Sequence, residues 1–192
     1  MKKTLLITLT IITLLFLFYI YEFPTTCKEQ LREGDIIFQT SKSRQSKFIA
    51  WATLSFDTHC GIVIYQNNKP YVLEASSTTR LTPVEEFCNK GLFDAFRVYR
   101  CTEKPVKITY KQYLGLSYDS QFNWSDKKYY CSELVWKIYK KQLGIELCKP
   151  QPLSEYMTIG LKKILKERNI NENSLFVAPS DISSSKLVHR IN

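Results

Sequence analysis

The strongest constraint on this chain is a cysteine at the start of an apolar, helix-periodic stretch, residues 128–139. A single buried helical stripe is indicated by apolar side chains at i, i+1, i+4 and i+5, which are Leu134, Val135, Ile138 and Tyr139. Cys131 is therefore predicted at or next to a helix N-terminus, where free N–H groups and the helix dipole stabilise an anion. A thiol in that place can have a lowered pKa and act as a nucleophile near neutral pH.

A nucleophilic thiol needs a base, and the chain has only two histidines, His59 and His189. His59 lies in a predicted β-hairpin, with strands over residues 58–65 and 71–75 and a five-residue loop between them. Glu74 lies near the end of the second strand, so an antiparallel hairpin brings it beside His59, where a carboxylate can orient the imidazole. A one-residue slip in register would turn Glu74 to the other face. His189 lies three residues from the C-terminus, in a stretch expected to fray.

The other elements follow from local patterns. We expect strands at 36–38 and 93–99, helices at 47–54 and 156–168, a connection with a short helical turn at 79–89, a helix-poor loop at 102–127, and a polar tail after 178–181. Gly144 is predicted to end the helix that begins near Cys131. These patterns indicate an α+β fold with a small antiparallel sheet.

Length and charge narrow the class of protein. The chain has 192 residues, 44% of them hydrophobic and 23% charged, which fits one globular domain. Its net charge of +9 comes from scattered Lys and Arg residues, with no glycine-rich phosphate loop and no RNA-binding aromatic motif, so nucleic acid is not an expected partner. The basic surface suits anionic lipid or a cell-wall polymer.

Residues 4–23 carry no charge until Glu22 and follow Lys2 and Lys3. The apolar run is longer than a usual signal core and has no small-residue cleavage site after it. We therefore expect residues 1–24 to be a transmembrane anchor or signal segment, anchored rather than removed. The domain, residues 25–192, would then lie on the extracytoplasmic side, in the cell envelope.

Six cysteines raise the question of disulfides, metal and redox chemistry. They are Cys27, Cys60, Cys88, Cys101, Cys131 and Cys148, and no two form a CxxC motif or a zinc-type cluster. No metal or other cofactor is expected, and a redox role is disfavoured. Strand alternation turns Cys60 away from His59, towards the core.

Several motifs together resemble one known family. In chain order they are Gly34-Asp35-Ile36-Ile37, His59 with Gly61-Ile62, Glu74-Ala75, Tyr118-Asp119, Tyr130-Cys131-Ser132-Glu133-Leu134, and Pro179-Ser180-Asp181. This order resembles the YiiX/YebB-like permuted papain-fold amidases, which look like NlpC-type cysteine peptidases with the chain circularly permuted. The likeness covers about residues 31–188, and its most specific parts are the Tyr-Cys-Ser-Glu-Leu block and the His-x-Gly strand.

The resemblance implies a circularly permuted papain-like (NlpC-type) fold in which the sheet packs against the cysteine helix. It implies Cys131 as nucleophile, His59 as base and Glu74 as the group that orients His59, where relatives often have another third residue. The backbone N–H of Cys131 and one further donor, Tyr118, would hold the oxyanion, and Tyr130 is a second candidate for oxyanion or substrate contact. Expected substrates are amides of peptides, including cell-wall muropeptides, or acyl esters of lipids.

Two alternatives stay open. The same cleft can serve a non-catalytic module that binds a peptide or lipid, although a pure binder needs no nucleophile and base together. Five aromatic residues could either line an apolar acyl-binding site or belong to the protein core. They are Trp51, Phe56, Tyr118, Phe122 and Trp124.

Overall fold

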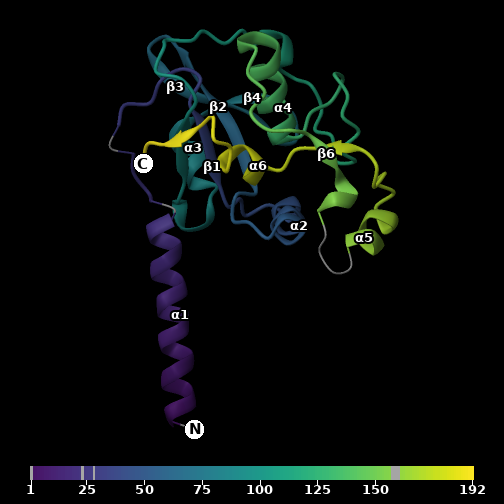
Figure 1. Cartoon of the computed structure of the whole chain (residues 1–192). Coiled ribbons are helices and arrows are strands. Elements are labelled where there is room, and N and C mark those ends of the chain that lie inside the picture. Colours follow the sequence, from purple (N-terminus) through teal and green to yellow (C-terminus); the bar gives the residue numbers. More distant parts are fainter. Residues whose placement is uncertain (1, 23, 28, 157–160) are drawn as a thin grey trace.

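The computed structural model describes residues 2–22, 24–27, 29–156 and 161–192. Its centre is an antiparallel sheet with the strand order β4-β3-β2-β1-β5-β8 (Figure 1). The strands are β1 (Ile36–Gln39), β2 (His59–Gln66), β3 (Lys69–Ala75), β4 (Thr79–Pro83), β5 (Arg97–Arg100) and β8 (His189–Arg190). A smaller sheet pairs β6 (Gln151–Pro152) with β7 (Leu175–Phe176).

The helices lie around the domain, except for the first, which extends away from it (Figure 1). They are α1 (Lys2–Glu22), α2 (Arg44–Thr53), α3 (Val84–Asn89), α4 (Cys131–Ile138), α5 (Leu161–Glu167) and α6 (Pro179–Ser183). Short 3-10 turns lie at Leu92–Asp94, Lys111–Tyr113 and Leu153–Glu155, and a π-helical turn, Tyr139–Leu143, continues α4. The predicted α+β class with an antiparallel sheet is confirmed.

The two faces of the sheet pack against different helices. Alternate residues of a strand point to opposite faces. On one face, Ile62 and Leu73 join the core that contains Leu134 of α4. On the other face, Val72 packs in a cluster with Phe87 of α3. The predicted packing of the sheet on the cysteine helix is therefore present, and α3 covers the opposite side.

A third apolar cluster attaches α2 and α5 to the region before α4. Phe48 of α2 packs with Phe122, Leu165 and Phe176. The N-terminus of α2 is capped by Ser43, whose Oγ accepts a hydrogen bond from the N–H of Ser46. The cap and the cluster hold α2 beside the end of the sheet where β2 begins.

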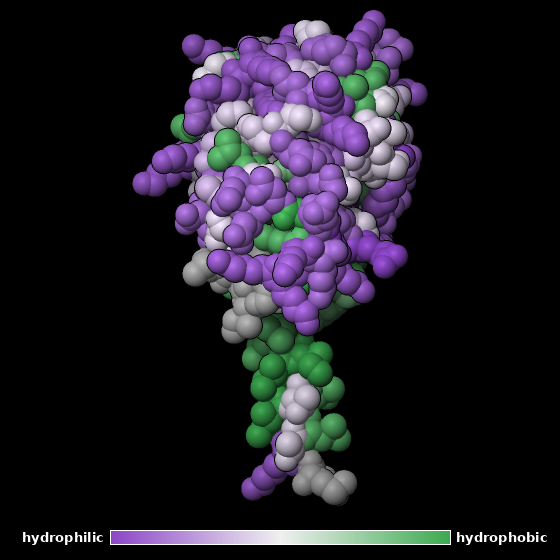
Figure 2. All heavy atoms as spheres, turned by 90° about the vertical axis from the view of Figure 1, so that its right-hand side faces the viewer, coloured by the Kyte–Doolittle hydropathy of each residue, from purple (hydrophilic) through white to green (hydrophobic). Residues whose placement is uncertain are grey.

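Helix α1 projects away from the domain (Figure 1). Its apolar side chains are largely exposed, as at Leu5 and Leu15, and Figure 2 shows them below a mostly hydrophilic face of the domain. At its domain end, Tyr19 packs edge-on against Phe56 and Phe93, each with ring centroids 5.6 Å apart. Within the described residues, no helix combines the length and the apolar character that crossing a membrane requires.

Several predicted elements are confirmed. The strand at 36–38 is β1, and the helix at 47–54 is α2, which begins earlier, at Arg44. The helix from Cys131 ends at Gly144, which adopts the left-handed conformation (φ 69°) that favours glycine. The loop at 102–127 contains only one 3-10 turn.

The predicted hairpin loop was too long. Asn67 and Asn68 alone connect β2 to β3. Both adopt positive φ (51° and 59°), which a two-residue type I′ turn requires and which makes so short a connection possible. The strand predicted at 93–99 begins only at Arg97, because Phe93 and the residue after it lie in the left-handed region and form a turn.

Two edge strands were missed. Residues 79–83, predicted as a connection, form β4, and the helical turn expected after Pro83 is α3. The prediction of a polar tail with a frayed His189 was also wrong, because His189 and Arg190 form β8, which pairs with β5. Both strands carry polar side chains, as sheet edges often do, and this hides the alternation. The helix expected at 156–168 is α5 in its second half, and residues 157–160 lie outside the described residues.

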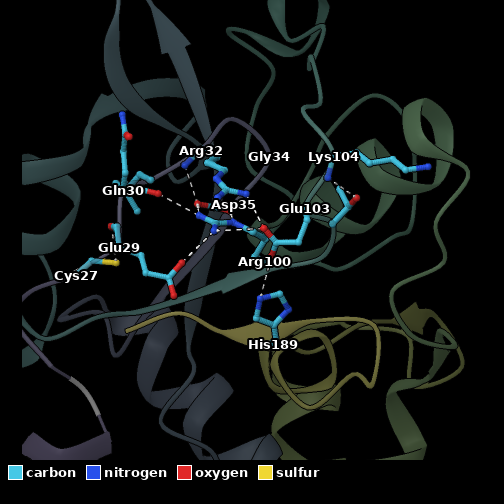
Figure 3. A network of polar contacts seen from close by, with 12 residues as sticks. Cys27, Glu29, Gln30, Arg32, Gly34, Asp35, Arg100, Glu103, Lys104 and His189 are labelled. Carbon is cyan, nitrogen blue, oxygen red and sulfur yellow. Dashed lines mark hydrogen bonds and ion pairs between the residues drawn. The ribbon is translucent and has the colours of Figure 1, made fainter.

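A buried ion pair ties the segment before β1 to β5 (Figure 3). The guanidinium of Arg100 donates to both carboxylate oxygens of Asp35 at 2.9 Å, and the two residues are 3% and 2% exposed. Arg100 also donates to the Glu29 carboxylate and the Gln30 carbonyl, each at 3.1 Å. Removing one buried partner leaves the other charge unpaired, which is costly.

We therefore expect Arg100→Met to destabilise the full chain by about 3–5 kcal/mol, since it leaves the buried Asp35 carboxylate without its cationic partner. Arg32→Met is the matched control, because Arg32 pairs with Glu103 at 2.6 Å but both side chains are more than half exposed. That change should cost less than about 1 kcal/mol. Urea unfolding measures both, and equal losses would contradict the role given to the buried pair.

Candidate active site

Cys131 is the first residue of α4. Tyr130 precedes it with extended backbone, and the Tyr130 N–H donates to the Glu133 carboxylate at 3.4 Å. The helix packs on β2 through Leu134, which holds the thiol against the start of that strand. Cys131 is only 1% exposed. The thiol thus lies at a helix N-terminus, as the apolar periodicity indicated.

His59 and Glu74 belong to the face of the sheet that α3 covers. His59 is the first residue of β2, and its ring stacks on Phe87 with centroids 5.5 Å apart. A carboxylate oxygen of Glu74 lies 2.6 Å from His59 Nε2. His59 stands at the end of its strand, and its imidazole lies close enough to the Cys131 thiol for each group to shift the pKa of the other. The structure therefore brings the three candidates together where the two faces meet.

The carboxylate of Glu74 is held on both oxygens. Oε2 contacts His59, while Oε1 accepts from Thr82 Oγ1 at 2.6 Å and from the Arg80 guanidinium at 3.3 Å. Lys90 Nζ lies 3.7 Å away. Glu74 is 1% exposed, so these partners replace water and fix the orientation of the carboxylate.

The charges of the three groups depend on one another. A hydrogen bond from Cys60, then the hydrogen bond and charge of His59, lower the pKa of Cys131 well below its ordinary value, against the opposing effect of burial. Burial lowers the pKa of His59, but its contacts with Cys131 and Glu74 outweigh this and raise the pKa to about 10. Burial acts against the Glu74 carboxylate, yet His59 and Thr82 lower its pKa to about 2. These directions favour the charged forms of all three groups: a thiolate, an imidazolium and a carboxylate.

Cys60 is the neighbour that sequence reasoning missed. Alternation placed it in the core, and it is fully buried there. Burial, then the contact with Cys131, raise the pKa of Cys60 well above its ordinary value, and the same contact lowers the pKa of Cys131. No local pattern links the two cysteines, because their contact arises only when α4 packs on β2.

A cavity of about 390 Å³ opens at the same place, and His59, Glu74 and Tyr118 form part of its wall. Burial, then the nearby charge of Cys131, raise the pKa of Tyr118 well above its ordinary value, so its hydroxyl remains a hydrogen-bond donor. Cys131 itself is not in the wall. It interacts with two residues that are, His59 and Tyr118.

Tyr130, the second tyrosine candidate, points into the core. Its ring stacks on Phe176 at 5.1 Å and meets Phe122 edge-on at 5.0 Å. Its hydroxyl accepts a hydrogen bond from the Val177 N–H at 3.2 Å. Of the two tyrosines, therefore, only Tyr118 faces the cavity.

The sequence left two possible places for five aromatic residues, an acyl site or the protein core, and the structure distinguishes between them. Among Trp51, Phe56, Tyr118, Phe122 and Trp124, only Tyr118 lines the cavity. Phe122 is fully buried, and Trp124 packs on Trp136 with centroids 5.3 Å apart. The cavity beside Cys131 is therefore not an aromatic acyl pocket.

Residues of the site do not fit a metal ion. In the part of the chain that the structure describes, no three His, Cys, Asp or Glu side chains are placed to hold one. Both oxygens of Glu74 already accept hydrogen bonds, and Glu133 pairs with Lys137 at 2.8 Å.

Comparisons with known proteins agree on one family. A family model described as permuted papain-like amidase enzyme, YaeF/YiiX, C92 family, matches residues 30–184. The uncharacterized protein YiiX of Escherichia coli K12 is 38% identical over 165 residues, covering 80% of this chain and 82% of its own. A crystal structure described as metalloprotein yiiX from Escherichia coli O157:H7 superposes with a TM-score of 0.79 at 36% identity, covering 85% of this chain and 98% of its own.

The thiol of Cys60 should set the acidity of Cys131. We expect Cys60→Ala to raise the pKa of Cys131 by about one unit or more, since a hydrogen bond to a charged group contributes roughly 1.5–3 kcal/mol. The pH profile of Cys131 alkylation by iodoacetamide, followed by peptide mass spectrometry, measures it. Cys88→Ala is the matched control, because Cys88 is also buried but belongs to α3 and packs in the cluster on the opposite face of the sheet. An unchanged profile in Cys60→Ala would show that the contact has no effect on the thiolate.

Proposed function

This chain belongs to the permuted papain-like amidase family, a family of cysteine amidase-type hydrolases, and we propose that it cleaves its substrate through Cys131 with His59 as base and Glu74 as orienting group. The observation that carries the proposal is the continuous contact from the Cys131 thiol through the His59 imidazole to the buried Glu74 carboxylate. The family match supports hydrolysis over the binding module that the sequence left open.

In the first step, the Cys131 thiolate attacks the substrate carbonyl carbon and the C=O electron pair moves to oxygen. When the tetrahedral intermediate collapses, the bond to the leaving group breaks and the His59 imidazolium gives its proton to the departing amine or alkoxide. A thioester on Cys131 remains. His59, now neutral, takes a proton from water, and the resulting hydroxide attacks the thioester and releases the acid and the thiolate.

The other groups support these charges. Glu74 holds the imidazole in place and stabilises its protonated form, as the carboxylate of a triad does. The oxyanion would be held by the N–H of Cys131, since the first N–H groups of a helix have no intrahelical partner, and by the Tyr118 hydroxyl. Both donors are neutral.

We also propose that the domain lies on the extracytoplasmic side of a membrane, held there by residues 1–24. The support is the uncharged run after Lys3 and the exposed apolar side chains of α1. Co-sedimentation of the full chain with membranes, lost on deletion of residues 1–24, tests this, and protease treatment of intact cells tests the side.

The hydrolase proposal predicts a covalent intermediate on Cys131. Incubation of the full chain with cell-wall muropeptides, and separately with acyl-ester lipids, should give an acyl adduct at Cys131 in mass spectra of acid-quenched samples, and none in Cys131→Ser. Glu74→Gln should slow turnover of the same substrate by about 10²-fold or more, because the neutral amide no longer stabilises the imidazolium.

Glu86→Gln is the matched control, since Glu86 is an exposed residue of α3 that pairs with Lys90 at the end of the same helix. Its turnover should stay within about twofold of the wild type. Product release by Cys131→Ser at the wild-type rate would contradict the mechanism.

A further inference from the structure

The cavity wall has a chemical character that the triad alone does not explain. Serine and glutamine side chains make up half of the wall, and its only aliphatic residues are Ile49 and Ala75. These side chains offer several hydrogen-bonding groups to a ligand. The wall can therefore hold a polar substrate.

The wall also carries more positive than negative charge. Its charged residues besides His59 are Arg44, Lys90 and Glu74, two cations to one carboxylate. Lys90 is already paired, at 2.7 Å from Glu86 and 3.7 Å from Glu74. Arg44, by contrast, forms no ion pair with the described residues. It is the first residue of α2, where the positive end of the helix dipole adds to its charge.

Two buried polar atoms of the wall have no hydrogen-bond partner among the described residues. They are Oε1 of Gln39, a residue that is 1% exposed, and Nε2 of Gln45, which neighbours Arg44. Buried polar atoms are nearly always paired in proteins. These two atoms are unsatisfied polar groups of wall residues, although the atoms themselves are buried and not part of the accessible surface of the cavity.

From these observations we propose that the substrate is a peptide-like amide that carries a free carboxylate close to the bond that is cut, and that Arg44 is the specificity residue that binds this carboxylate. The inference rests on the proposed function, because it takes Cys131 as the attacking group. A guanidinium binds a carboxylate through two parallel hydrogen bonds, and this pairing selects for charge and shape together.

The test compares two alkylating reagents of equal size, N-iodoacetylglycine, which carries a carboxylate, and N-iodoacetylglycinamide, which is neutral. The rate constant for alkylation of Cys131 in the full chain is measured for each by peptide mass spectrometry, and their ratio is divided by the same ratio for free cysteine. We expect the carboxylate reagent to be favoured about tenfold in the wild type. Arg44→Gln should bring the ratio close to one, and Arg44→Lys should keep part of the preference.

Lys47→Gln is the matched control, because Lys47 is an exposed cation on the same helix that does not line the cavity. It should leave the ratio unchanged. A wild-type ratio of one, or a ratio that Arg44→Gln does not alter, would overturn the role of Arg44 and leave the proposed hydrolase intact. Failure of both reagents to modify Cys131 would overturn the inference together with the proposed function.

Discussion

The hydrogen bond between His59 and Glu74 is the interaction on which the rest of the site depends. It is 2.6 Å long and largely shielded from water, so a carboxylate and an imidazolium stabilise each other there. Without it, burial would favour a neutral histidine, and the thiolate of Cys131 would lose its counter-ion. Strand β4 supports the same bond from behind, because Thr82 and Arg80 occupy the second oxygen of Glu74.

The fold produces this contact by using both faces of one sheet. Helix α4 brings Cys131 onto one face and α3 closes the other over His59. Between them, Gly61 in β2 has no room for a side chain, since an added Cβ would lie 2.4 Å from Val72 Cγ1 and 2.7 Å from the Leu73 carbonyl oxygen. In the His-x-Gly motif of the sequence, His59 is thus required by the chemistry of the site and Gly61 by the packing of the strands.

Sequence patterns predicted the parts of this arrangement that are local. Periodicity placed Cys131 at a helix start, and antiparallel pairing placed Glu74 beside His59. The contact between Cys60 and Cys131 depends on how a helix packs on a distant strand, and no local pattern reports that. The same holds for Arg44 and Gln39, which look like ordinary polar residues until α2 and β1 meet at the cavity. The length of the turn at Asn67 was overestimated, and the edge strands were missed, because polar residues there satisfy several conformations equally.

The central claim is that His59 makes Cys131 a thiolate, and the pH dependence of Cys131 alkylation by iodoacetamide tests it most directly. Peptide mass spectrometry on the full chain gives the pKa of this one thiol in the wild type and in His59→Ala, with His189→Ala as the matched control, since His189 is exposed and lies on the far edge strand β8. The account predicts a pKa well below the free value of about 8.5 that rises towards or above it only in His59→Ala. An ordinary pKa in the wild type, or one that His59→Ala leaves unchanged, would contradict it.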